Sequence, residues 1–223
     1  HTLTQRCKGA ASVEVVPFDL ADRGCWDAAI ERARRAFGRI DVLVHNAGVS
    51  QRARFAELAP EVIERLYLVD LIAPVQLTHR VLPAMVESGG GHLVFVSSLV
   101  GLVASPQRTI YSSAKHGING FADALRAEVA VSGVAVTLAL PGFVQTEVSL
   151  NALEGDGTLH GKMDPGQQRG ISAERCARVL VRAIEREKRE VHVGMGLVGR
   201  VAVLLKRIAP GLLARILRRA KVT

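Results

Sequence analysis

Several kinds of residue and motif are scarce or missing in this chain of 223 residues, and each absence narrows the class of protein. No apolar run reaches the roughly 18 residues that a membrane-spanning helix needs, and no secretory signal is visible. The three cysteines, Cys7, Cys25 and Cys176, lie far apart without a Cys-x-x-Cys pair, so we expect reduced, buried thiols in a cytoplasmic protein. The seven histidines show no metal-ligand spacing, and we predict no metal site.

Acidic residues are missing from the C-terminal part of the chain. The formal net charge is +8, yet the first 190 residues are close to neutral. Seven basic residues and no acid follow Glu190: Arg200, Lys206, Arg207, Arg215, Arg218, Arg219 and Lys221. Because the excess charge is confined to this tail, and no aromatic platform or base-reading motif accompanies it, we expect no nucleic-acid partner.

The segment 196–223 mixes those basic residues with apolar ones, and Pro210-Gly211 divides it into two short parts. Neither part is long enough to span a bilayer. Apolar residues interspersed with arginine and free of acids are typical of an interfacial helix on anionic lipid, which predicts a peripheral membrane contact. The alternative is a C-terminal element that packs on the substrate pocket or on a neighbouring subunit. The sequence leaves both interpretations open.

Residues 1–11 are predicted to contain the end of a helix and a turn at Gly9. After them, short β-branched runs alternate with segments of helical periodicity. The runs predict strands over 13–16, 40–44, 93–96, 134–140 and 190–193. Helices are predicted from about Arg23 with Asp22 as N-cap, over 60–87 as one helix or two joined near Pro74, over 111–129 and over 172–188. This alternation predicts a single α/β domain with a parallel sheet.

The stretch from Ser97 to Lys115 carries the clearest chemistry. Tyr111 and Lys115 are four residues apart on a predicted helix, so both side chains lie on one face. A lysine ammonium beside a phenol favours the phenolate and lowers a pKa that is otherwise about 10. Ser98 ends the preceding strand, where its hydroxyl can hold a substrate oxygen against the tyrosine. These residue types suit general acid–base catalysis near neutral pH.

Turn motifs follow other strands at their carboxyl ends. Asn46-Ala47-Gly48 follows the strand 40–44, and Pro141-Gly142 with Val144 and Thr146 follows the strand 134–140. Ligands of open α/β sheets bind outside the carboxyl ends of the strands, so these turns and Ser98 are expected to meet in one crevice.

Together these motifs resemble the short-chain dehydrogenase/reductase family over about residues 10–195. The resemblance implies a Rossmann-like, doubly wound parallel sheet with Tyr111 as catalytic acid/base, Ser98 as orienter of the carbonyl and Lys115 on the nicotinamide ribose. It implies that these residues bind the cofactor: Asp19, Leu20, Asn46, Ala47, Gly48, Tyr111, Lys115, Pro141, Gly142, Val144 and Thr146. Residues 149–157 resemble the dehydrogenase/reductase member 7 and 7B branch in the sequence Ser149-Leu150-Asn151-Ala152-Leu153, followed by Gly155-Asp156-Gly157.

Asp70 departs from the family pattern, in which asparagine usually occupies this position and its main-chain carbonyl holds a water in the proton relay. Aspartate keeps that carbonyl and adds a charge, and we include Asp70 among the catalytic residues.

The Gly-rich turn that holds a pyrophosphate is also missing, since no Thr-Gly-x-x-x-Gly-x-Gly occurs in the chain. Losing the first βαβ unit would leave ladder hydrogen bonds unmade in the middle of the sheet. We therefore expect about 30 to 45 upstream residues, roughly one such unit, in the native protein. The family's determinant for NAD or NADP lies in that unit, and the resemblance favours NADP(H) over NAD(H).

The resemblance implies an oxidoreductase that transfers a hydride between a nicotinamide cofactor and a carbonyl or secondary alcohol. It suggests a lipophilic substrate similar to a steroid or retinoid. Residues 1–195 are expected to form the domain, residues 147–171 a mobile substrate lid, and residues 196–223 a separate basic amphipathic segment. The family's helix pairing across a two-fold axis predicts a homodimer or homotetramer. The alternative function is a catalytically impaired scaffold or binding protein.

Overall fold

The computed structural model describes residue 7, residues 9–10 and residues 12–219. Within this part of the chain, the main sheet has four parallel strands in the order β1-β2-β3-β6. Their bounds are β1 Val42–His45, β2 Gly91–Val96, β3 Val134–Pro141 and β6 Glu190–Val193. In register, Phe95 of β2 lies opposite His45 of β1 and Leu138 of β3. The predicted strands from residue 40 onward are therefore confirmed.

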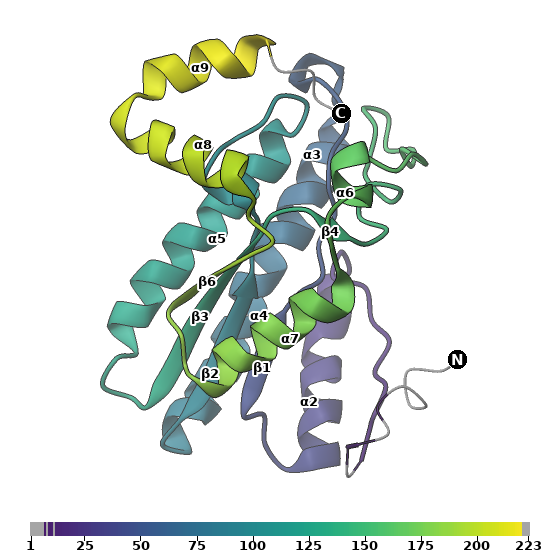
Figure 1. The fold of residues 1–223 in the computed structure, drawn as a ribbon. Coiled ribbons are helices and arrows are strands. Elements are labelled where there is room, and N and C mark those ends of the chain that lie inside the picture. The colour runs from purple at the N-terminus through teal and green to yellow at the C-terminus, as the bar shows by residue number, and fades with distance from the viewer. Residues whose placement is uncertain (1–6, 8, 11, 220–223) are drawn as a thin grey trace.

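Helices cover both faces of this sheet (Figure 1). The helices around the sheet are α2 Trp26–Phe37, α4 Ala73–Glu87, α5 Thr109–Glu128 and α7 Ala173–Glu185. On one face, α4 and α5 bury Met85 and Leu125 in a core shared with Leu93 of β2. On the other face, α7 packs its Ala183 against Val191 of β6. The arrangement is the predicted α/β fold, a parallel sheet with helices on both sides.

The predicted strand over 13–16 is wrong. Residues 12–19 form no strand ladder, and Val15 and Phe18 are 41% and 43% exposed. A strand is held by backbone hydrogen bonds to a neighbour, and β1 at the edge of the sheet does not pair with these residues. The Gly9 turn is present, with Ala10 N–H donating to the Cys7 carbonyl at 3.0 Å. The rest of the helix end predicted within 1–11 falls largely outside the described residues.

Two of the predicted helix starts are confirmed by side-chain caps. The Asp22 side chain accepts a hydrogen bond from Gly24 N–H and begins the short helix η1 (Arg23–Cys25), which continues into α2. Ser172 caps α7 by accepting from Arg175 N–H at 3.2 Å.

The predicted helix over 60–87 is two helices with a wider turn between them. α3 (Pro60–Tyr67) runs into a π-helical turn, η3 (Leu68–Ile72), before α4 begins. Pro74 has no N–H to donate to the carbonyl of Asp70, so the regular α-helical ladder is interrupted here. Such π turns are frequent at functional sites, and this one carries Asp70.

The cysteine prediction is wrong in part. The three thiols are unpaired, but Cys7 is exposed and Cys25 and Cys176 are half-buried, so they are not the core residues that we expected. Cys25 lies at the start of α2, where its Sγ contacts the Asp22 carbonyl oxygen at 2.9 Å.

The lid segment, residues 147–171, is more ordered than its glycine content suggests. Its flanks pair as β4 (Val144–Gln145) with β5 (Ile171–Ser172), and it contains the short helix α6 (Pro165–Gln168). Leu153 is 4% exposed and packs on Leu66 of α3. Buried contacts thus hold the segment against the domain.

The C-terminal segment forms two helices, α8 (Leu197–Ile208) and α9 (Pro210–Arg219), so the predicted break at Pro210 is confirmed. They project together from the upper end of the domain (Figure 1, yellow). Across the described residues, none of the helices combines the length and the apolar character needed to cross a membrane.

Candidate active site

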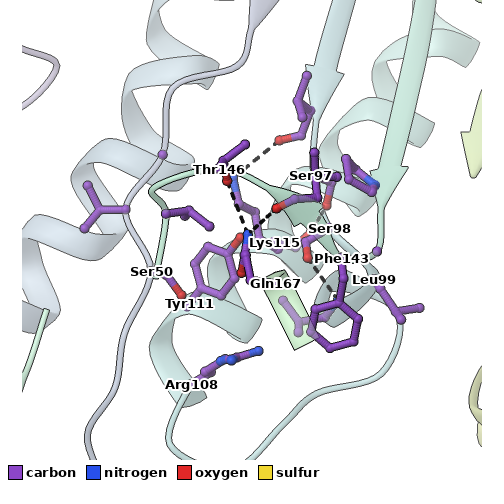
Figure 2. A pocket seen from close by; sticks show the side chains of 18 of the residues that line it. Ser50, Ser97, Ser98, Leu99, Arg108, Tyr111, Lys115, Phe143, Thr146 and Gln167 are labelled. Carbon is purple, nitrogen blue, oxygen red and sulfur yellow. Dashed lines mark hydrogen bonds between the residues drawn. The ribbon is translucent and has the colours of Figure 1, made fainter. Parts of the chain in front are cut away.

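A cavity of about 490 Å³ lies where β1, β2 and β3 end (Figure 2). The wall includes ten of the residues predicted from the sequence: Asn46, Ala47, Gly48, Ser98, Tyr111, Lys115, Pro141, Gly142, Val144 and Thr146. Three others are elsewhere. Asp19 and Leu20 are not part of this wall, and Asp70 lies behind Lys115, which separates it from the cavity.

Three of the four predicted catalytic residues, Ser98, Tyr111 and Lys115, lie on this wall. Tyr111 and Lys115 lie one turn apart on α5, with the Lys115 ammonium nitrogen 5.6 Å from the centre of the Tyr111 ring. Lys115 Nζ also donates to the Val96 carbonyl at 3.4 Å. Ser98 follows β2 and caps the short helix η4 (Leu99–Gly101), its Oγ accepting from Val100 N–H at 3.3 Å. A carbonyl in the cavity can therefore meet a phenol, a hydroxyl and a cation.

Gln51, which we did not predict, fixes the start of α5. Its fully buried side chain reaches the helix N-terminus, where Oε1 accepts from the N–H groups of Ile110 at 3.0 Å and of Tyr111 at 3.4 Å. Its Nε2 donates to the Ala53 carbonyl at 2.9 Å, so the amide is anchored at both ends. Since the first N–H groups of a helix have no partner within the helix, Gln51 satisfies them and holds Tyr111 in place. It is a positioning residue.

Asp70 forms a buried ion pair with Lys115. The Asp70 Oδ1 lies 3.1 Å from Lys115 Nζ, and the two side chains are 0% and 6% exposed. Burial raises the pKa of the Asp70 carboxyl, an effect that the Lys115 charge and the Val49 N–H partly offset. Burial alone would lower the pKa of Lys115, but the negative charges of Asp70 and of a Tyr111 phenolate outweigh it and raise that pKa. Asp70 therefore keeps Lys115 protonated.

Gly48 is required by this ion pair. A Cβ at Gly48 would lie 2.6 Å from Asp70 Oδ1 and 3.2 Å from Lys115 Nζ. The glycine of the Asn-Ala-Gly turn thus permits the backbone to approach the pair.

Replacing Gly48 by Ala should therefore lower both stability and turnover, with a loss of about 1–3 kcal/mol typical of overpacking. The matched control is Gly120→Ala on α5, where a Cβ would meet nothing within 4 Å. This control should stabilise the protein by about 0.5–1 kcal/mol, because alanine is the better helix former. Urea unfolding measures both changes, and a Gly48→Ala protein as stable as wild type would contradict the assigned crowding.

Asp70→Asn should leave activity near neutral pH equal to that of wild type or higher, because asparagine keeps the main-chain carbonyl. The pH profile should change. The charge of Asp70 raises the pKa of Lys115, so removing it allows burial to lower that pKa. In the variant, Lys115 then loses its proton at a lower pH than in wild type. The alkaline limb of the pH profile of kcat/KM should therefore shift to lower pH. Complete loss of activity in a folded variant would show that the carboxylate has a further role.

A second buried ionic cluster, also missed by the sequence analysis, ties the lid segment to the cavity wall. Asp164 of the lid segment accepts from Arg52 in a short contact and from Arg108 Nη2 at 2.9 Å. The Asp164 and Arg52 side chains are 4% and 5% exposed. The polar run Ser50-Gln51-Arg52, one residue after the Asn-Ala-Gly turn, was the available sequence signal.

The wall fits the nicotinamide end of a dinucleotide. The Asn46-Ala47-Gly48 turn lines the cavity, and the Thr146 hydroxyl lies on the same wall with a hydrogen bond from Gln167 Nε2 at 3.2 Å. Gly142 has a different reason: a Cβ there would lie 2.6 Å from the Gly194 carbonyl oxygen, so its glycine serves packing against the end of β6.

Comparison with known proteins gives the family of this chain. The short chain dehydrogenase family model matches residues 1–156. Dehydrogenase/reductase SDR family member 7B of Mus musculus is 37% identical over 203 residues, 91% of this chain and 62% of that relative. Dehydrogenase/reductase SDR family protein 7-like of Drosophila melanogaster is 36% identical over 198 residues, 89% of this chain and 60% of that relative.

Solved structures share the fold. A short-chain dehydrogenase from Streptomyces avermitilis matches with a TM-score of 0.73 at 23% identity, over 92% of this chain and 80% of that chain. A short-chain dehydrogenase from Sphingobium yanoikuyae in complex with NADPH matches with a TM-score of 0.68 at 25% identity, over 92% of this chain and 76% of that chain.

The parallel sheet with helices on both faces, and its likeness to these structures, define a Rossmann-like, doubly wound fold. The chain belongs to the short-chain dehydrogenase/reductase family, and its similarity to the 7B and 7-like relatives confirms the predicted branch. It spans about three-fifths of the length of these curated relatives.

Proposed function

We propose that this protein transfers a hydride between a nicotinamide cofactor and a carbonyl or secondary alcohol on a lipophilic small molecule. The observation that carries the proposal is the position of Ser98, Tyr111 and Lys115 on one wall of the cavity, beside the Asn-Ala-Gly turn. Apolar side chains on the same wall, Leu99, Val100, Phe143 and Val148, favour a lipophilic substrate.

Each residue has a defined task in this reaction. The Ser98 hydroxyl donates a hydrogen bond to the substrate oxygen and orients it toward Tyr111. Tyr111 gives its phenolic proton to that oxygen during reduction and takes it back during oxidation. Lys115 remains protonated beside Asp70 and holds its positive charge 5.6 Å from the centre of the Tyr111 ring. The nicotinamide cofactor, when bound, supplies or accepts the hydride.

We propose NADP(H) as the preferred cofactor. The solved relative in complex with NADPH supports this choice. Titration of the full-length protein with NADPH and with NADH, followed by cofactor fluorescence, should give saturable binding of both and tighter binding of NADPH. Binding of neither would favour the second candidate, a scaffold or binding protein, for which the Asp70–Lys115 pair and the missing Gly-rich turn are the motivating observations.

We propose that residues 147–171 act as the substrate lid on a domain formed by residues 1–195. The lid segment contributes Val148 and Asn151 to the cavity wall, and Asp164 holds it by ion pairs. A substrate lid must open for exchange. Protection of Leu153 N–H from hydrogen exchange should therefore rise when cofactor and substrate are both bound.

We propose a homodimer, or a homotetramer built from it, through α4 and α5. An isologous interface of this kind repeats the same surface on both subunits. Light scattering of the full-length protein at micromolar concentration should give at least twice the chain mass. A monomeric mass would exclude this assembly.

We propose that α8 and α9 place a cytoplasmic protein on anionic lipid. Five apolar side chains of α8 are 46–84% exposed, namely Leu197, Val198, Val201, Leu204 and Ile208. Lys206 and Arg207 lie in its last turn, and no acid occurs in either helix. Apolar surface flanked only by cations complements an anionic membrane. Gly199 of α8 lies close to Leu99 of the cavity wall, since a Cβ at Gly199 would be 3.0 Å from the Leu99 side chain. A substrate dissolved in the lipid would therefore have a short path to the cavity.

Vesicle co-sedimentation tests this surface. Binding should be stronger to anionic than to neutral vesicles and should fall in Leu204→Asp and on deletion of residues 196–223. The matched control is Val181→Asp on α7, which is 51% exposed but lies on another surface. Equal binding to neutral vesicles, or binding that survives the deletion, would assign these helices to protein packing instead.

A further inference from the structure

The cavity wall contains more buried positive than negative charge. Three cations lie on it: Arg52 and Lys115 are buried, and the Arg108 side chain is 12% exposed. Two buried carboxylates face them: Asp70 pairs with Lys115, and Asp164 pairs with both arginines. Glu147 also lies on the wall, but its side chain is exposed to solvent, which screens its charge. One buried positive charge is therefore uncompensated by a buried acid.

That charge belongs to Arg108, because Arg52 has a full set of partners. Arg52 contacts both carboxylate oxygens of Asp164 and donates from Nη1 to Ser50 Oγ at 2.8 Å and to the Gln51 carbonyl at 2.7 Å. Within the part of the chain that the structure describes, Arg108 makes one hydrogen bond, from Nη2 to Asp164 Oδ2. Its Nε is buried and has no hydrogen-bond partner among the described residues. A buried donor without a partner is costly, so the group is suited to a ligand acceptor.

The backbone holds Arg108 at the cavity rather than in solvent. Gln107 has a φ of 59°, a conformation that non-glycine residues seldom adopt, and its carbonyl accepts from Ala53 N–H at 3.3 Å. Arg108 follows as the N-cap of α5, one turn before Tyr111. Figure 2 shows Arg108 near Tyr111 among the side chains that line the cavity. Strained backbone of this kind clusters at functional sites.

The electrostatic environment agrees with this geometry. Burial lowers the pKa of the Arg108 guanidinium from its ordinary value, and the nearby charge of Arg52 lowers it further, while Asp164 opposes both. Arginine remains charged at any ordinary pH even so, and an oxyanion in the cavity would relieve the unfavourable field of two adjacent guanidinium groups.

We propose that Arg108 binds an anionic group, a carboxylate or a phosphate, on the substrate whose carbonyl Tyr111 protonates. This assignment rests on the proposed function and narrows its substrate class to lipophilic carbonyl compounds that carry an oxyanion. Arginine suits both anions because its N–H groups match their oxygen geometry. Arg52 and Asp164 act as positioning residues that hold the Arg108 guanidinium in the wall.

The first test compares ketones with the same carbon chain that end in an anionic or a neutral group. A medium-chain keto acid, its methyl ester and the corresponding keto-alkyl phosphate are reduced by the full-length protein, and kcat/KM is measured for each. The acid or the phosphate should exceed the neutral ester by roughly 10- to 100-fold, mainly through KM, because a charge-assisted hydrogen bond is gained. Which anion is preferred identifies the group.

Variants then show whether Arg108 is the cause. In Arg108→Gln, the kcat/KM for the anionic substrate divided by the kcat/KM for the ester should fall to about one. Arg108→Lys should restore part of this preference for the anion. Arg65→Gln is the matched control, since Arg65 is an exposed residue in the last turn of α3, away from the cavity wall. A ratio unchanged in Arg108→Gln, or no anion preference in wild type, overturns the proposal while leaving the oxidoreductase function intact.

A binding measurement separates the anion site from catalysis. Calorimetric titration with decanoate and with decyl phosphate should show binding that weakens at least tenfold in Arg108→Gln, and decanol should show no such dependence. If no ketone is reduced but this dependence is seen, the oxidoreductase function fails and the anion site stands. If the anions bind both proteins equally well, the anion site is wrong. Thermal melting of each variant establishes that it is folded.

Discussion

Tyr111→Phe is expected to lower turnover by roughly 10²- to 10⁴-fold, the range of lost general acid–base catalysis, while cofactor still binds. Phenylalanine keeps the ring that lies 5.6 Å from the Lys115 ammonium and removes only the group that carries the proton. The N-terminus of α5 remains capped by Gln51, whose contacts are to backbone N–H groups that the substitution leaves in place. The defect should therefore be in kcat, with little change in stability.

The chain provides a matched control for this substitution. Tyr67, the only other tyrosine, donates from its hydroxyl to Ser113 Oγ at 3.0 Å outside the cavity. Tyr67→Phe removes the same atom and should keep activity near the wild-type level. Steady-state kinetics with NADPH and a reducible ketone compare the two. Full activity in Tyr111→Phe would remove Tyr111 from the catalytic role.

Asp164→Ala is expected to cost about 3–5 kcal/mol of folding stability, because it leaves two guanidinium groups buried without a counter-charge. Asp164 is 4% exposed, and its partners Arg52 and Arg108 are 5% and 12% exposed. Loss of the carboxylate also removes both ion pairs that Asp164 of the lid segment makes with the arginines of the cavity wall. Urea unfolding at neutral pH measures the change as a lower midpoint.

A surface ion pair serves as the comparison. Asp123 pairs with Arg126 at 2.6 Å, but Asp123 is 62% exposed, and exposed pairs contribute about 0–1 kcal/mol. Asp123→Ala should therefore shift the midpoint little. Similar losses in the two variants would show that the Asp164 cluster is solvated and has no special role in stability.

Much of the fold and of the active site follows from local sequence. Strands such as 93–96 are buried apolar runs, and the cap at Asp22 depends on residues two positions away. Tyr111 and Lys115 are related by helical spacing, and Ser98 by the end of a strand. Such signals need no knowledge of distant contacts, which is why these elements could be predicted.

The features that were missed depend on contacts between distant parts of the chain. Asp164 meets Arg52 across 112 residues, and Gln51 reaches the N-terminus of α5 across 59. The polar run Ser50-Gln51-Arg52 is a local signal, but no local pattern identifies the distant partners of these residues. The wrong strand at 13–16 has the same cause, since a β-branched run becomes a strand only where a neighbouring strand pairs with it.

Asp70 shows how structure changes the meaning of a sequence departure. In the sequence it is a charged residue where the family usually has asparagine. In the fold it lies in the π-helical turn η3, and its carboxylate contacts the Lys115 ammonium directly. The added charge is therefore matched by an existing cation rather than left alone in the core.

The central claim is hydride transfer with proton transfer by Tyr111, and isotope transfer tests it most directly. The full-length protein is given NADPH deuterated on one face of nicotinamide C4, and then the other, with a lipophilic ketone, and the alcohol is analysed by mass spectrometry. We predict one deuterium on the carbinol carbon from one of the two labelled cofactors only, and almost none with Tyr111→Phe in the same time. If the alcohol carries no deuterium from either labelled cofactor, hydride transfer from nicotinamide C4 is contradicted. If Tyr111→Phe forms as much labelled alcohol as wild type, proton transfer by Tyr111 is contradicted.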